Sequence, residues 1–153
     1  MIGIEKPYYS FESSPDALVF EFESVSQKKT IRKAVIYEAI EGYENLFQLG
    51  FGDITEEGEI DFIAVSKNKD RDKILATVAQ TMVTFFEKYP TKKLYFRGST
   101  DTRTRLYRSL ISKFIEVIEP YFEVIGLEQD GSPEKFIVNQ DYNAFIINQY
   151  GTE

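Results

Sequence analysis

The chain has 153 residues, of which 42% are hydrophobic and 28% charged, and these values predict one globular domain over residues 1–153. It contains neither cysteine nor histidine, which excludes disulfides, Ser-His-Asp triads, imidazole bases and zinc sites built from nitrogen or sulfur ligands. The net charge of −7 argues against sequence-independent binding to DNA, because such binding needs many lysines and arginines.

The sequence pattern contains no sign of membrane insertion or export. No apolar run approaches the roughly 18 residues that a membrane span needs, and the start of the chain, Met1 to Lys6, lacks the basic and apolar regions of a signal peptide. We therefore expect a cytoplasmic protein. Neither a P-loop nor a Rossmann fingerprint is present, and we expect no cofactor.

The first half of the chain is typical of short strands. Apolar and polar residues alternate, and short turns rich in serine, proline, aspartate and glycine separate the alternating segments. This pattern predicts an antiparallel meander. The expected strands cover residues 8–11, 18–24, 30–40, 45–51 and 59–64.

A long helix is expected from Asp70 to Tyr89, because apolar residues recur there with the helical period and Pro90 follows. Asn68 or Asp70 can cap its start. The face opposite the apolar stripe is small and uncharged in its middle. It predicts either a second packing layer or a homodimer contact through Thr77, Thr81 and Thr84.

The second half predicts a strand over 92–97, a helix over 102–119 and strands over 122–127, 135–138 and 142–148. Strands dominate, and only one short strand separates the two helices. The fold class is therefore expected to be α+β, with a mostly antiparallel sheet and both main helices packed on one of its faces.

The segment from Arg97 to Arg108, which we call the arginine segment, has the pattern most suggestive of binding. An apolar strand leads through small hydroxyl residues into an arginine-rich helix, and residues 92–113 contain seven basic residues against one acidic residue. Free N–H groups at a helix start and nearby guanidinium groups suit a phosphate or carboxylate. The expected ligand-binding residues are Arg97, Gly98, Ser99, Thr100, Arg103, Arg105, Tyr107 and Arg108.

A purely structural interpretation of the arginine segment stays open. In it, Ser99 or Asp101 caps the helix and the arginines bond to sheet carboxylates such as Asp53 or Glu38. Two further alternatives are an enzyme acting on a nucleotide or nucleic-acid phosphodiester, with Tyr107 or an aspartate transferring the proton, and a homodimeric toxin-like interaction protein.

Two other residue sets receive a structural interpretation. Aspartates and an asparagine gather between residues 53 and 72, but they lack the glycine and glutamate of a calcium loop, and no metal is expected. Strand aromatics can stack on nucleic acid, yet carboxylates lie among most of them, which favours core packing. Tyr95 and Phe96, beside the basic segment, are the exceptions. A nucleic acid partner is therefore not favoured.

Three segments together resemble an uncharacterised family of small bacterial proteins. They are Leu49-Gly50-Phe51-Gly52-Asp53, Lys73-Ile74-Leu75-Ala76-Thr77-Val78-Ala79, and Gly98-Ser99-Thr100-Asp101-Thr102-Arg103-Thr104-Arg105-Leu106-Tyr107-Arg108. The resemblance covers most of the chain and implies that the three segments belong to one domain. The family has no established activity, cofactor or partner, so the resemblance implies none for this chain.

Overall fold

The computed structural model describes residues 6–61, 70–97, 112–137, 142 and 144–150. The expected α+β class is confirmed: within these residues the strands form a mostly antiparallel mixed sheet, accompanied by two helices. The strand order is β1-β2-β3-β4-β6-β9-β7-β8, with β5 paired to β4, and β4 and β6 run parallel.

The elements follow one another as β1 (Phe11–Ser13), β2 (Val19–Val25), β3 (Thr30–Ala39), β4 (Leu46–Ile54), β5 (Ile60–Asp61), α1 (Arg71–Lys88), β6 (Lys93–Arg97), β7 (Phe122–Leu127), β8 (Pro133–Lys135) and β9 (Ala144–Gln149). Residues 112–118 are also helical. No helix in the described ranges is both long enough and apolar enough to cross a membrane.

The chain divides into two compact units, each made of two stretches. The first unit comprises Met1–Glu38 with Leu49–Lys88, and the second comprises Ala39–Gln48 with Tyr89–Glu153. The single domain expected from the composition is not tested by this division and stays a prediction.

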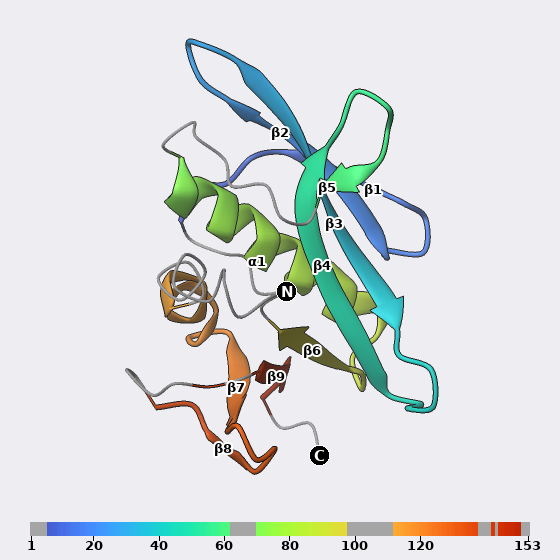
Figure 1. The fold of residues 1–153 in the computed structure, drawn as a ribbon, viewed down its shortest axis with the longest axis vertical. Coiled ribbons are helices and arrows are strands. Elements are labelled where there is room, and N and C mark those ends of the chain that lie inside the picture. The colour runs from blue at the N-terminus through green and yellow to red at the C-terminus, as the bar shows by residue number, and fades with distance from the viewer. Residues whose placement is uncertain (1–5, 62–69, 98–111, 138–141, 143, 151–153) are drawn as a thin grey trace. The chain divides into compact units, whose positions relative to one another are not determined.

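In the first unit, α1 lies along the sheet formed by β2, β3 and β4 (Figure 1). Alternate β2 residues are buried, as the period of two requires, and the antiparallel register pairs Phe20 with Val35 on that inner face. Tyr37 of β3 stacks on Phe85 of α1 with ring centroids 4.6 Å apart. An aromatic pair therefore forms part of the contact between this helix and the sheet.

The small face of α1 packs inside the first unit. Thr77 and Thr81 are fully buried. The Thr77 hydroxyl accepts the Tyr9 N–H at 2.9 Å, and the Thr81 hydroxyl lies 2.7 Å from the Tyr37 hydroxyl. Of the two predicted roles of this face, Thr77 and Thr81 therefore have the first, packing against a second layer of the same unit. Their side chains are not exposed for contact with a second copy of the chain. Dimerisation itself stays a prediction.

The first predicted strand is misplaced by a few residues. Residues 8–11 were expected to be extended in the sheet, but β1 begins at Phe11 and its register runs from Phe11 opposite Phe22. The physical reason is the Tyr9 N–H, which bonds to the Thr77 side chain on α1 instead of to a neighbouring strand.

In the second unit, β6 lies between the start of β4 and β9. Leu94 and Phe96 lie on the same face of β6. Leu94 is fully buried, and Phe96 packs against Phe114 of helical residues 112–118 at a centroid distance of 5.8 Å. Phe96 and Tyr95 are both half-buried, but Phe96 packs on the helical residues whereas Tyr95 lies on the other face of β6.

The last strands of the second unit also differ from expectation. Residues 135–138 were predicted as a strand and Pro133 as loop, yet β8 runs from Pro133 to Lys135. Because β8 is the terminal strand of the ladder, its proline N has no neighbour to bond and is tolerated there. The final strand begins at Ala144, two residues later than predicted.

Candidate functional site

The arginine segment begins at the end of a central strand. Arg97 is the last residue of β6, where its Cα lies opposite Ala144 of β9. The other predicted ligand-binding residues, namely Gly98, Ser99, Thr100, Arg103, Arg105, Tyr107 and Arg108, lie outside the described residues. The structure therefore supplies the two ends of this segment, β6 before it and helical residues 112–118 after it.

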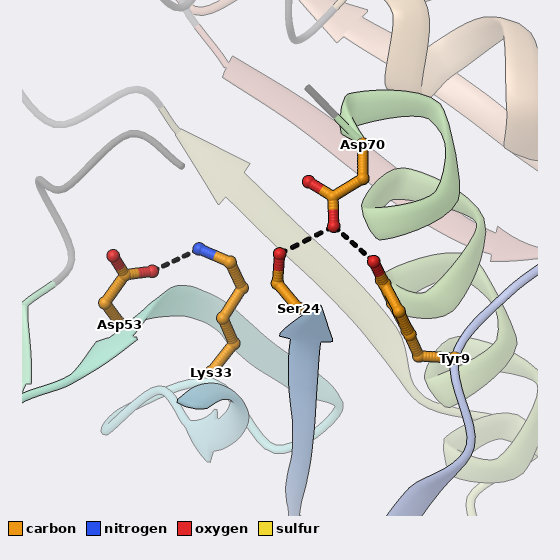
Figure 2. A network of polar contacts seen from close by, with 5 residues as sticks. All are labelled: Tyr9, Ser24, Lys33, Asp53 and Asp70. Atoms are coloured by element: carbon orange, nitrogen blue, oxygen red, sulfur yellow. Dashed lines mark hydrogen bonds and ion pairs between the residues drawn. The ribbon is translucent and has the colours of Figure 1, made fainter. Parts of the chain in front are cut away.

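A second group of polar residues, which sequence reasoning did not assemble, lies in the first unit. It comprises Tyr9, Ser24, Lys33, Asp53 and Asp70, and we call it the polar cluster (Figure 2). Its members come from the segment before β1, from β2, β3 and β4, and from the residue before α1. Ser24 and Lys33 project from the inner face of the sheet, where most neighbours are apolar.

Lys33 and Asp53 form an ion pair. Only 1% of the Lys33 side chain is exposed, against 19% of the Asp53 side chain. The Lys33 ammonium also lies 5.5 Å from the centre of the Phe51 ring, within the range of a cation–π contact. The carboxylate therefore balances a positive charge that is almost completely removed from water.

Asp70 collects two hydroxyl groups on one carboxylate oxygen. Its Oδ2 accepts the Tyr9 hydroxyl at 2.5 Å and the Ser24 hydroxyl at 2.6 Å (Figure 2). Its Oδ1 is buried and has no hydrogen-bond partner in the described part of the chain. The Asp70 side chain therefore does not cap α1, because its bonded oxygen accepts hydrogen bonds from Tyr9 and from Ser24 of β2. The other predicted cap, Asn68, lies outside the described residues.

Tyr9 is held on several sides. Its hydroxyl also accepts the Val25 N–H at 3.2 Å, its ring stacks on Phe22 at a centroid distance of 5.9 Å, and the Lys73 ammonium lies 4.2 Å from its ring centre. Burial, followed by the hydrogen bond to Asp70, raises the pKa of Tyr9 above its ordinary value. The Tyr9 phenol is thus a neutral donor that ties the N-terminal segment to α1.

The geometry of the polar cluster favours a structural role over catalysis. Ser24 is fully buried and Lys33 nearly so, which leaves neither nucleophile open to a substrate. Within the described ranges, no three acidic side chains gather in the way a metal ion requires. The cluster instead fixes the start of α1 to β2 and stabilises the buried charge on β3.

The sequence contained a weak signal for Lys33. In β3, Lys33, Val35 and Tyr37 alternate, and the two apolar residues of this series point to the core. A lysine at the position that alternates with these two apolar residues predicts either that the inward-facing series ends before it or that its charge is buried. Its partner Asp53, twenty residues later, gave no comparable signal.

Comparison with known proteins identifies the family of this chain. The profile of DUF6934, a family of unknown function, matches residues 5–150, and the chain belongs to this family. The resemblance to a family without an established activity is thereby confirmed. Neither the curated proteins nor the solved structures contain a significant match.

Proposed function

We propose that this protein is a binding or regulatory domain that recognises a phosphate-bearing or carboxylate-bearing ligand through the arginine segment. Arg97, Arg103 and Arg105 donate charge-assisted hydrogen bonds to the anion. Ser99 and Thr100 contribute hydroxyl groups, and Gly98 allows close approach of the backbone. Tyr107 and Arg108 complete the binding residues.

The observation that carries the proposal is the position of the segment between β6 and helical residues 112–118. The sequence pattern predicts that this helix begins at residue 102, and a helix start leaves free backbone N–H groups available to an anion. Seven basic residues against one acidic residue between 92 and 113 give this connection a positive charge in an otherwise acidic chain.

Asp53, one of the two carboxylates considered as partners of the arginines, is the partner of the buried Lys33. The structural interpretation of the arginines stays an alternative prediction, because Arg103 and Arg105 lie outside the described residues.

The test uses inorganic phosphate as the probe and compares wild type with the double variant Arg103→Ala/Arg105→Ala by isothermal titration calorimetry. We expect measurable phosphate binding by wild type, strong loss of affinity in the double variant and little change in Tm. Arg32→Ala is the matched control, because Arg32 is exposed and pairs with Glu21 in the first unit. Unchanged phosphate affinity in the double variant, or ready unfolding of it, would contradict the proposal.

A further inference from the structure

The sheet of the first unit has two faces, and α1 packs on one of them. Phe20 and Phe22 of β2 are buried on the face that α1 covers. Val19, Glu21 and Glu23 alternate with them along the strand, and all three are exposed on the other side. We call this other side of β1, β2 and β3 the outer face.

The outer face contains a hollow of about 270 Å³, whose apolar lining is formed by Val19, Ala34, Ile54 and Ile60. Ala34 is small and 1% exposed, so it forms the floor. Val19 is 37% exposed and the two isoleucines are half-buried, so they form the walls. Small-molecule sites measure about 300–1,000 Å³. The hollow therefore suits one apolar side chain of a larger partner better than a whole small ligand.

Glutamates lie beside the hollow on β1 and β2. Glu21 lines it together with Arg32, and these two form an exposed ion pair at 2.8 Å. Glu12 lies directly opposite Glu21 in the register, and Glu23 lies opposite Arg32. Among the described residues, neither Glu12 nor Glu23 has an ion-pair partner. Like charges directly opposite each other on two strands are unfavourable, and a cationic partner would relieve that repulsion.

The turn between β4 and β5 adds to the negative charge. Gly58 of this turn lines the hollow, and Glu56, Glu57 and Glu59 around it are exposed. The outer face and this turn thus contribute six glutamates, whereas the lining contains Arg32 as its cation. The two lysines of the turn between β2 and β3 follow the opposite end of β2 from the hollow. The electrostatic potential at the hollow is therefore negative.

We infer that the outer face binds a basic segment of a protein partner, with an apolar side chain in the hollow and lysine or arginine side chains against the glutamates. Charge complementarity selects this occupant. Nucleic acids and anionic membranes carry the same sign of charge as the glutamates, and a second copy docked through the same face would oppose like charges. This surface lies wholly in the first unit and uses no residue of the arginine segment.

The test is an NMR titration of isotope-labelled protein with three synthetic hexapeptides, which alternate lysine with leucine, lysine with serine, and glutamate with leucine. Shifts of the backbone amides report both the affinity and the position of binding. We expect the lysine–leucine peptide to shift the amides of Ala34, Gly58 and their neighbours. Replacing leucine by serine should weaken binding about tenfold, because no apolar side chain then enters the hollow. The glutamate–leucine peptide should not bind measurably.

Two variants should change the affinity for the lysine–leucine peptide in opposite directions. Glu12→Gln/Glu23→Gln removes two exposed carboxylates and should weaken binding about threefold or more. Arg32→Gln removes the competing cation and should strengthen binding by a similar factor. The matched control is Glu41→Gln/Glu44→Gln, which makes the same charge change at two exposed glutamates of the second unit and should leave the affinity unchanged.

Four results would overturn the inference. They are a wild type that binds none of the peptides, equal affinity for the leucine and serine peptides, equal losses in the two glutamate variants, and amide shifts confined to residues away from the outer face. A wild-type dimer that dissociates in Glu12→Gln/Glu23→Gln, measured by sedimentation velocity, would assign the face to a second copy and overturn the inference of a foreign partner. Each of these results leaves the proposed function standing, because phosphate binding is measured separately on the arginine variants.

Discussion

Removal of the Asp53 carboxylate is expected to destabilise the first unit strongly. Lys33 is 1% exposed and lies on the apolar face of the sheet against Phe51. Asp53→Ala would leave its ammonium group without a counter-charge in a place that water hardly reaches. Breaking a buried ion pair from one side costs about 3–5 kcal/mol. That is a large part of the roughly 5–15 kcal/mol that keeps a domain folded.

Removing Lys33 should destabilise the protein less than removing Asp53, because the two side chains differ in exposure. Lys33→Met removes the buried charge and leaves a carboxylate that keeps 19% of its side chain exposed, so water can still solvate it. We expect this variant to lose no more than about 1–2 kcal/mol, since an apolar side chain of similar length suits the site. The double variant Lys33→Met/Asp53→Ala should resemble Lys33→Met and be more stable than Asp53→Ala.

The assay is urea unfolding followed by circular dichroism at 222 nm, which reports on α1, with midpoints and slopes compared between variants. The control is Glu21→Ala, which breaks the exposed pair with Arg32, the neighbour of Lys33 on β3. That pair is 60% and 46% exposed on its two sides, and its loss should change stability by less than about 1 kcal/mol. Equal losses for Asp53→Ala and Lys33→Met, or no recovery in the double variant, would refute the reasoning.

Two further predictions concern glycine packing and alkaline stability. An added Cβ at Gly126 would lie about 2.5 Å from ring atoms of Tyr142, so Gly126→Ala should lower stability by about 1–3 kcal/mol, measured by thermal unfolding, and Tyr142→Ala in the same chain should relieve the clash. Burial raises the pKa of Tyr37 well above its usual value, with a smaller opposing effect of the Thr81 hydrogen bond. The unfolded phenol ionises near pH 10, so the contribution of Tyr37 is complete below that pH and declines above it by up to about 1.4 kcal/mol per pH unit. Tyr37→Phe should therefore flatten the loss of urea stability between pH 10 and 11, and an unchanged slope would contradict this account.

Periodic segments were predicted well because their signal is local. The helix expected over 70–89 is α1, Arg71–Lys88, and the strand expected over 122–127 is β7, Phe122–Leu127. The misplaced strands are short ones at the ends of the ladder, β1 and β8, where few residues contribute to the pattern. The parallel pairing of β4 and β6 also escaped prediction, although a helix between two strands in the chain allows it.

The candidate binding residues were found by charge and composition, and those from Gly98 to Arg108 lie outside the described residues. The polar cluster shows the opposite case. Each of its members has an ordinary local explanation as a turn, cap or strand residue. Only the positions of their atoms show that Asp70 accepts hydrogen bonds from Tyr9 and Ser24, and that Asp53 forms an ion pair with Lys33.

The sequence by itself determined which chemistries are absent, where the long helix and most strands lie, and which segment concentrates positive charge. Tertiary structure decided that the threonine face of α1 is internal, that a lysine is buried on β3, and that Phe96 is the β6 residue that packs against Phe114. Hydrophobic periods of 2 and 3.6 residues arise within a few positions of the chain. Hydrogen bonds such as that from Tyr9 to Thr77 join residues 68 positions apart, and no local pattern carries that pairing.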